Sequence, residues 1–170
     1  MPRLLVIHHS PTRALQALTD QVVAGTHDES IPGVEVVVRP ALDFATGAAD
    51  HLDLLTADGY VVGTTANFGY MSGALKHVFD STFLQVGGAL SDDGSGGAGS
   101  GSTSGRPFGL YVHGRYDTTG AERAVLSITG ALRWRQAAEV LAVMGDVTPA
   151  HLDAAYELGG TISALLSPGS

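Results

Sequence analysis

The chain has 170 residues, of which 44% are hydrophobic, and it carries a formal net charge of −8. This length suits a single domain with one sizeable core. The acidic balance argues against a nucleic-acid partner, because phosphate backbones are bound by Lys and Arg. The absence of cysteine excludes disulfides, cysteine-ligated zinc and thiol catalysis. No apolar stretch approaches the roughly 20 residues that span a bilayer, so we expect a cytoplasmic protein without a membrane partner.

Strands and helices are expected to alternate along the chain. Nearly continuous apolar runs predict buried strands at residues 3–9, 34–40, 59–64, 107–114 and 136–145. Helical patterns occupy residues 10–26, 46–57, 72–86, 119–132 and 148–166, the last with Thr148 as N-cap and Pro149 in the first turn. This alternation predicts an α/β fold, with a five-stranded parallel sheet and helices on both faces. The length favours the strand order 2-1-3-4-5.

A low-complexity segment interrupts the pattern at residues 94–105, which contain only Gly, Ser, Ala and Thr. Such a composition can bury nothing, so we expect a flexible loop. The part that follows begins with one more strand and is too short to build its own core. We therefore interpret the segment as a loop inside a single domain that spans residues 1–170.

Ligands of such sheets bind beyond the carboxyl ends of the strands, at the point where the strand order reverses. In the order 2-1-3-4-5 this point lies between the first and third strands. The rule selects three loops for closer attention, at residues 10–15, 64–69 and 113–119.

The first loop, HHSPTRALQ, has the features of an anion site. Ser10 and Thr12 offer hydroxyls, and the backbone amides up to Ala14 and Leu15 point out of the N-terminus of the next helix. Arg13 adds a positive charge. No G-x-G-x-x-G or GK[ST] pattern is present, so a monophosphate fits better than a dinucleotide or a nucleoside triphosphate. The alternative is that Ser10 or Thr12 only caps the helix and that Arg13 is an ordinary surface residue.

The second loop lies within GTTANFGYMSGALK, residues 63–76. Its hydroxyls, amides and close-approaching glycine suit the polar edge of a flat ring, and Phe68 can pack beside that ring. The wall would consist of Thr65, Ala66, Asn67, Phe68 and Gly69. The alternative is an ordinary loop, with Phe68 in the core and Ser72 as a helix cap.

This segment resembles the flavin loop of the flavodoxin-like NAD(P)H:quinone oxidoreductases of the tryptophan-repressor-binding-protein type. Their motif reads roughly G-[TS]-P-x-x-F/Y-G-x-M-[SA]-x-x-[ML]-K. The matching residues are Gly63, Thr64, Phe68, Gly69, Met71, Ser72 and Lys76, followed by Phe79, Asp80 and Thr82. Thr65 stands in place of the proline. The likeness extends more weakly from the first strand to about Gly120.

The resemblance implies a flavodoxin-like three-layer sandwich that binds FMN noncovalently. It implies NAD(P)H as electron donor, a quinone-like small molecule as acceptor and a homo-oligomer, a dimer or a tetramer. The FMN phosphate would lie against Ser10, Thr12, Arg13, Ala14 and Leu15, and the ring along residues 65–69. Arg13 stands where the family often has glycine. No catalytic side chain is expected, because the cofactor carries the chemistry.

The third loop would line the other side of the ring, with His113, Gly114, Arg115, Tyr116 and Thr118 as contacts. Tyr116 can stack on the flavin, and Arg115 can stabilise a reduced flavin or meet a nicotinamide cofactor's phosphate. His113 can donate a proton to a quinone. The alternatives are an exposed Tyr116, an ion pair between Arg115 and Asp117, and a structural His113.

Two further functions stay open: a one-electron carrier of the flavodoxin kind, and a flavodoxin-like protein that has lost its cofactor. The second follows from Arg13 and from the missing proline. A metal site is not expected, because the adjacent His8 and His9 would point to opposite faces of a strand. The single tryptophan, Trp134, either belongs to the core or covers the site from a partner subunit.

Overall fold

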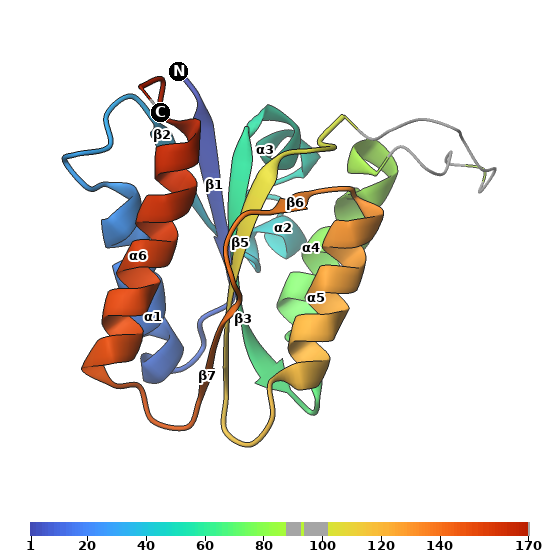
Figure 1. Cartoon of the computed structure of the whole chain (residues 1–170). Coiled ribbons are helices and arrows are strands. Elements are labelled where there is room, and N and C mark those ends of the chain that lie inside the picture. The colour runs from blue at the N-terminus through green and yellow to red at the C-terminus, as the bar shows by residue number, and fades with distance from the viewer. Residues whose placement is uncertain (88–92, 94–101, 170) are drawn as a thin grey trace.

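The protein is described by a computed structural model that covers residues 1–87, 93 and 102–169. One mixed sheet runs through it (Figure 1). Its main strands are β1 (Arg3–His8), β2 (Glu35–Pro40), β3 (Gly59–Asn67), β5 (Pro107–Gly114) and β7 (Leu141–Met144). They pair in parallel in the order β2-β1-β3-β5-β7. The predicted order 2-1-3-4-5 is thereby confirmed.

The fifth strand is divided. The sequence predicts one strand at residues 136–145, but β6 (Arg135–Gln136) pairs with the start of β5 and β7 pairs with its end. Between them the chain leaves the ladder, although the amide of Ala137 still donates to the carbonyl of Phe108 at 2.9 Å. Alanine and glutamate at residues 137–139 have low strand propensity. Only the four residues of β7 therefore extend this edge towards the carboxyl end.

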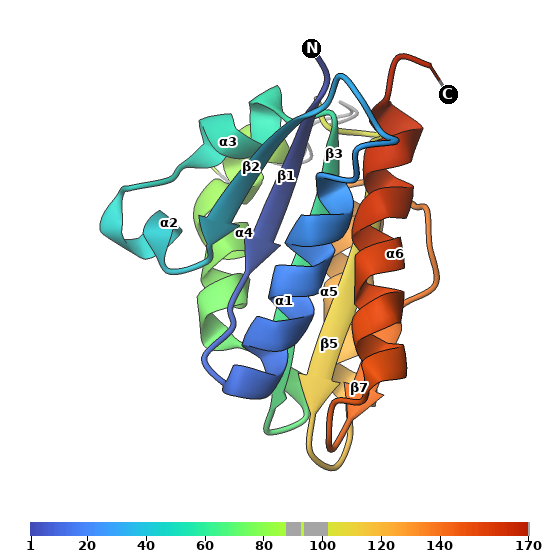
Figure 2. The ribbon, with the colours of Figure 1, turned by 90° about the vertical axis from the view of Figure 1, so that its left-hand side faces the viewer.

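Helices cover both faces of the sheet (Figures 1 and 2). The helices α1 (Arg13–Thr26) and α6 (Pro149–Leu166) lie on one face. On the other lie α2 (Asp43–Thr46), α3 (His51–Thr56), α4 (Gly73–Val86) and α5 (Thr119–Ala131). Alternate strand residues face the two layers: Leu4, Val6 and Tyr111 pack towards α1 and α6, whereas Leu5 and Tyr60 pack towards α4 and α5. This is the expected three-layer α/β sandwich.

Side-chain caps fix the beginnings of α1, α4 and α6, and Asp50 caps the short α3. Thr12 accepts the amide of Leu15 at the start of α1, and Ser72 accepts the amide of Leu75 at the start of α4. Thr148 caps α6, with proline in its first turn, as predicted. A side-chain oxygen in this position satisfies an amide that has no partner inside the helix.

Hydrogen bonds between residues far apart in the sequence hold α1 and α6 together. The hydroxyl of Ser163 in α6 donates to the carbonyl of Thr26 at 3.1 Å. The hydroxyl of Tyr156 donates to the carboxylate of Asp28 at 2.7 Å. Hydrogen bonds from Ser30 and Tyr156 lower the pKa of Asp28 to about 2. These contacts hold the carboxyl end of α1 against α6.

Trp134 is buried at the amino end of the sheet. Its ring stacks on Tyr60, with centroids 3.8 Å apart, and its Nε1 donates to the hydroxyl of Thr103 at 2.9 Å. Trp134 is therefore a core residue at the end opposite the three loops. Residues 94–101 of the predicted flexible loop lie outside the described residues, and its end, residues 102–105, forms a turn with Thr103 buried. Among the described helices, none is both long and apolar enough to cross a membrane.

Candidate functional site

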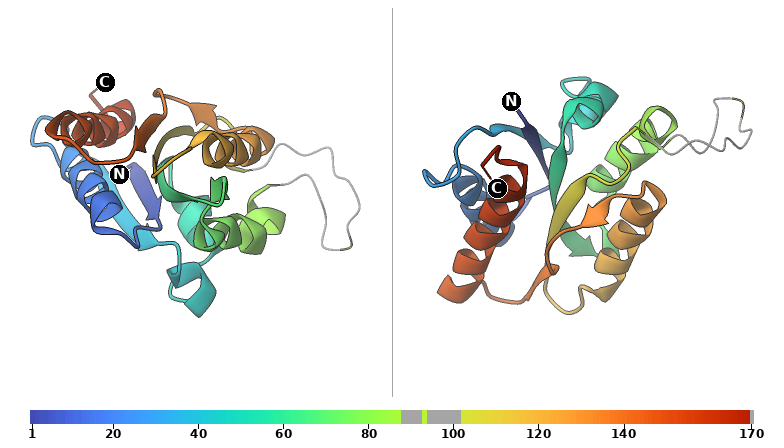
Figure 3. Two further views of the ribbon diagram at one scale, coloured as in Figure 1. Left: turned by 90° about the horizontal axis from the view of Figure 1, so that it is seen from below. Right: turned by 45° about the horizontal axis from the view of Figure 1, so that its top comes forward.

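The strand register brings the ends of the three loops to one edge of the sheet. His8 of β1 is level with Gly63 of β3, and Thr65 of β3 is level with His113 of β5. All three strands are parallel, so their carboxyl ends meet (seen from below in Figure 3, left). The predicted meeting of the three loops follows from this pairing.

The first loop begins α1 with a capped turn. The hydroxyl of Thr12 accepts the amide of Leu15 at 3.2 Å, and its carbonyl accepts the amide of Gln16 at 2.9 Å. The side chain of Leu15 is fully buried in the core, so this residue can offer a ligand only a backbone group. The amides of Arg13 and Ala14 stand in the first turn, where the helix supplies no carbonyl. These two amides and the exposed Arg13 side chain are the groups of the loop that are available to an anion.

Ser10 is part of an internal chain of hydrogen bonds. Its Oγ lies 2.9 Å from Nδ1 of His8 and 2.7 Å from the hydroxyl of Thr19. The hydroxyl of Thr19 lies 2.7 Å from that of Tyr111. The carbonyl of Ser10 accepts the side-chain amide of Gln16 at 3.1 Å. A serine hydroxyl can make three hydrogen bonds, so Ser10 retains the capacity for one more partner.

The second loop is a β-hairpin, which the sequence did not predict. β3 continues three residues beyond the expected Thr64, and β4 (Tyr70–Met71) pairs antiparallel with its end. The two turn residues, Phe68 and Gly69, have φ of 51° and 75°, the signature of a type I′ turn. Phe68 is fully exposed at the tip, so the alternative that places it in the core is wrong. A bulky residue in this left-handed region costs about 1–2 kcal/mol.

Beneath the hairpin, the strand end is locked to the next helix. The hydroxyl of Thr64 accepts the amide of Ser72 at 3.0 Å and donates to the carbonyl of Thr65 at 2.9 Å. Ser72 in turn caps α4, as the alternative interpretation expected. Asn67 is paired with Tyr70 in the hairpin, and both are exposed. Ser72 thus caps the helix, and the hairpin end before it is exposed.

Two buried polar atoms at this edge have no hydrogen-bond partner in the described part of the chain: Nδ1 of His9 and the hydroxyl of Thr65. Buried polar atoms are nearly always paired, so each points to a ligand or to ordered water. The amide of His9 donates to the carbonyl of Gly63 at 3.0 Å, which fixes His9 beside β3. Burial lowers the pKa of His9. The sequence prediction missed His9, because the adjacent histidines were considered only as a chelating pair.

Most polar side chains of the third loop bind other groups of the protein. Nε2 of His113 donates to the carbonyl of Gly145 at 2.7 Å, which supports the structural interpretation of this histidine. Arg115 pairs with Asp146 at 2.9 Å, so the alternative that pairs it with Asp117 is wrong. The hydroxyl of Thr118 donates to Glu122 at 2.7 Å. Asp117 itself accepts the amide of Thr119 at 2.9 Å, at the beginning of α5.

What the third loop offers a ligand is its backbone and Tyr116. The side chain of Tyr116 is 88% exposed. A Cβ on Gly114 would lie 3.0 Å from that of Ala66, so the two loops approach closely. At Gly120 a Cβ would overlap the carbonyl of Gly69. The second and third loops thus close against each other, and a ligand common to all three has to lie over them.

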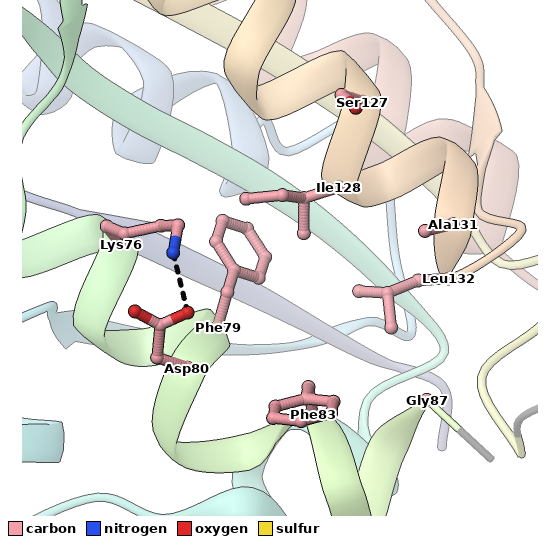
Figure 4. Close-up of a pocket in the computed structure, with 9 residues that line it drawn as sticks. All are labelled: Lys76, Phe79, Asp80, Phe83, Gly87, Ser127, Ile128, Ala131 and Leu132. Atoms are coloured by element: carbon pink, nitrogen blue, oxygen red, sulfur yellow. Dashed lines mark hydrogen bonds and ion pairs between the residues drawn. The ribbon is translucent and has the colours of Figure 1, made fainter. Parts of the chain in front are cut away.

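The tail of the resemblance motif serves helix packing. Lys76, Phe79 and Asp80 line a groove of about 390 Å³ between α4 and α5 (Figure 4). Lys76 and Asp80 form an ion pair at 2.7 Å along α4. Ile128 of α5 and Leu132, which follows α5, lie on the other side of the groove. In the described residues, no group of three or more His, Asp or Glu side chains is placed to hold a metal ion.

No family model matches the chain. Solved structures do resemble it over nearly its whole length. An archaeal flavodoxin superposes with a TM-score of 0.74 at 15% identity and covers 96% of this chain and 98% of its own. Oxidised flavodoxin 1 from Bacillus cereus gives 0.73 at 12%, with 97% and 99% covered. A WrbA-like flavodoxin protein from Agrobacterium tumefaciens gives 0.66 at 15%, with 98% of each chain covered. At these identities the likeness shows a flavodoxin-like fold.

Proposed function

We propose that this protein binds FMN noncovalently over the three loops and passes electrons from NAD(P)H to a quinone or a similar acceptor. The observation that carries the proposal is the pair of buried, unpartnered atoms, Nδ1 of His9 and Oγ1 of Thr65. They lie at the reversal point of the strand order, where sheets of this kind bind ligands. The flavodoxin-like fold supports the same proposal by analogy.

The phosphate of FMN fits the first loop. The amides of Arg13 and Ala14 and the remaining hydrogen bond of Ser10 would hold it, and the helix dipole of α1 favours its charge. The Arg13 side chain replaces the glycine that the resemblance leads us to expect, and it adds a positive charge. Thr12 contributes indirectly, because its hydroxyl is used to cap α1.

The rest of the cofactor fits the other two loops. His9 and Thr65 have the hydrogen-bonding capacity for its hydroxyls or ring edge. Phe68 and Tyr116 are the exposed aromatic side chains that can cover the ring and exclude water from it. Bound FMN would supply hydride acceptance from the nicotinamide and electron transfer to the acceptor. The protein's contribution is binding, orientation and exclusion of water.

The first test is a titration of purified protein with FMN, followed by flavin fluorescence, with riboflavin as the control that lacks the phosphate. We expect quenching by FMN and weaker binding of riboflavin. Unquenched fluorescence at saturating protein would overturn the proposal and leave the fold without its cofactor. Replacing Thr65 by Val removes one unpartnered hydroxyl at nearly constant volume, and we expect it to weaken flavin binding without destabilising the protein.

The second test separates an enzyme from a one-electron carrier. The FMN-loaded protein is mixed rapidly with NADH or NADPH, and the flavin absorbance is followed. Bleaching within the turnover range of ordinary enzymes supports the oxidoreductase. Absorbance that persists with both nucleotides, but is lost when a flavodoxin reductase is added, supports the carrier. We extend the proposal to a cytoplasmic homo-oligomer, a dimer or a tetramer, whose mass sedimentation velocity would measure.

A further inference from the structure

The feature that carries a further inference is the chain of hydroxyls that ends at Ser10. Tyr111 of β5 is fully buried, and its ring passes over Gly63 of β3, where a Cβ would overlap it. Its hydroxyl reaches Thr19 of α1, and Thr19 reaches Ser10 at the end of β1, each at 2.7 Å. The chain ends on Nδ1 of His8 at 2.9 Å. It therefore connects the core to the proposed phosphate loop (Figure 2 shows α1 over these strands).

Burial determines which hydroxyl donates and which accepts at each step of this chain. Burial raises the pKa of the Tyr111 hydroxyl against the opposing effects of the nearby Thr19 and Ser10 hydroxyls, so the group keeps its proton. A buried hydroxyl proton without an acceptor costs about 1–3 kcal/mol. The distance alone allows either hydroxyl to donate, but within the described part of the chain Thr19 is the hydrogen-bond partner of the Tyr111 hydroxyl. The buried proton of Tyr111 therefore needs Thr19 as its acceptor. The single proton of Thr19 then goes to Ser10, which becomes an acceptor on that side.

Ser10 can thus donate its one hydroxyl proton to either of two acceptors. One is Nδ1 of His8, when that nitrogen carries no proton. The other is an anion held by the amides of Arg13 and Ala14. A phosphate oxygen can only accept, so Ser10 must donate to it. His8 must then carry a proton on Nδ1 and donate to Ser10.

We propose that the buried chain Tyr111–Thr19–Ser10 leaves Ser10 with a single free hydroxyl proton, which it donates to Nδ1 of His8 in the free protein and to the phosphate in the complex. When phosphate binds, the ring proton of His8 moves from Nε2 to Nδ1 by exchange with water, and Nδ1 then donates to Ser10. This inference rests on the proposed function, because it concerns the FMN phosphate. Tyr111 and Thr19 are positioning residues that never touch the ligand, and His8 reports the exchange. The groups that face His8 are His9 of its own loop, Asp20 of α1 and Asp43 at the start of α2.

Variants of the chain provide the first test. In Tyr111→Phe, the hydroxyl of Thr19 no longer accepts from Tyr111 and can accept the proton of Ser10. In Thr19→Val, Ser10 loses the inward donor that fixes the rotation of its hydroxyl. We expect the affinity for FMN to fall about three- to tenfold, and the affinity for riboflavin to stay constant. Thr19→Ser retains the hydroxyl and should restore the ratio of the two affinities.

The matched control is Tyr60→Phe. The hydroxyl of Tyr60 is also buried, donates to the carbonyl of Leu54 at 2.8 Å and lies at the opposite end of the sheet. Its removal should leave the ratio of FMN affinity to riboflavin affinity unchanged. An unchanged ratio in Tyr111→Phe and Thr19→Val, with wild-type protein that binds FMN, would overturn the inference and leave the proposed function intact.

Nitrogen NMR of the histidine side chains provides a second test that needs no flavin. In free protein the chain predicts that His8 carries its proton on Nε2 and leaves Nδ1 unprotonated, with the signal assigned by its loss in His8→Asn. A protonated Nδ1 in the free protein contradicts the inference, even if FMN fails to bind. Addition of FMN to the wild type should shift Nδ1 to the protonated range, whereas riboflavin should not shift it.

Discussion

Phe68 is the residue at which local preference and site geometry conflict most clearly. It occupies the first position of a two-residue turn with φ of 51° and is fully exposed. Asparagine and glycine are the residues that type I′ turns favour there. Conformational strain of this kind persists where the residue serves a purpose other than stability. An aromatic side chain at the tip of the proposed flavin wall supplies such a purpose.

We therefore predict that Phe68→Asn stabilises the protein and weakens flavin binding. The gain should be about 1 kcal/mol, because the left-handed conformation no longer carries a bulky side chain. Urea unfolding measures the stability, and flavin fluorescence measures the binding. Tyr116→Asn makes a similar exchange at an exposed residue without positive φ, and its stability should stay within about 0.5 kcal/mol of wild type. Loss of stability in Phe68→Asn would contradict the assignment of strain to this turn.

The adjacent histidines show a second residue-scale effect. Burial and the neighbouring His9 lower the pKa of His8, against the opposing effects of Asp20 and Asp43, and burial lowers the pKa of His9. Between the lowered folded-state pKa values and the ordinary value of 6.5, the unfolded chain therefore binds more protons than the folded protein. The lowered pKa values of the two histidines cost no stability above pH 6.5. The free energy of unfolding then decreases as the pH falls from 6.5 towards the folded-state pKa values.

We predict a lower urea midpoint at pH 5.5 than at pH 7.5 for the protein without flavin. Asp28, whose pKa is lowered to about 2 from 3.8, loses its contribution only at more acidic pH, so this interval isolates the histidines. Asparagine at positions 8 and 9 cannot titrate. The urea midpoint of the double variant His8→Asn with His9→Asn should therefore change less between the two pH values. An equal change in wild type and variant would assign the effect to other groups.

At the scale of elements, Gly63 lets β3, β5 and α1 come into contact. The ring of Tyr111 from β5 occupies the space where a side chain on β3 would lie, and its hydroxyl reaches Thr19 of α1. β3 therefore needs a glycine at position 63, which is level with His8 of β1. His8 lies shortly before the first loop. The same glycine belongs to the motif that suggested a flavin loop. Its structural role here is to let the hydroxyl chain pass.

We predict that Gly63→Ala destabilises the protein by at least about 1–3 kcal/mol, the usual cost of overpacking a filled core. Gly73→Ala is the matched control, because a Cβ there meets nothing within 4 Å at the start of α4. Its stability should equal that of wild type or exceed it by up to about 1 kcal/mol. The fluorescence of the single tryptophan, buried beside Tyr60, follows unfolding in urea. A Gly63→Ala variant as stable as Gly73→Ala would show that the Tyr111 ring can move aside.

At the scale of the whole molecule, the sequence predicts the arrangement better than it predicts the site. Continuous apolar strands alternating with amphipathic helices determine the layers and the order of the sheet. The hairpin was not predicted, because Thr65 and Asn67 suit a loop as well as a strand end. The chain from Tyr111 to Ser10 joins residues separated by 92 positions at its Thr19 step, and a single sequence does not show such a contact. His9 was missed because only the fold reveals that its Nδ1 is buried and unpaired.

The net charge of −8 separates the two forms of the proposed redox function. A nicotinamide donor is an anion, so the field of the protein slows its approach, whereas a basic reductase is attracted. Raising the ionic strength from 0.01 to 0.15 M shortens the Debye length from about 30 to 8 Å and weakens both effects. If NAD(P)H is the donor, its bimolecular rate of flavin reduction should rise a few-fold over this interval. Reoxidation by a neutral quinone serves as the control and should stay constant, because no long-range charge steers that molecule. A nicotinamide rate that falls with salt would contradict repulsion and place the exposed cations of the edge, Arg13 foremost, in control of the approach.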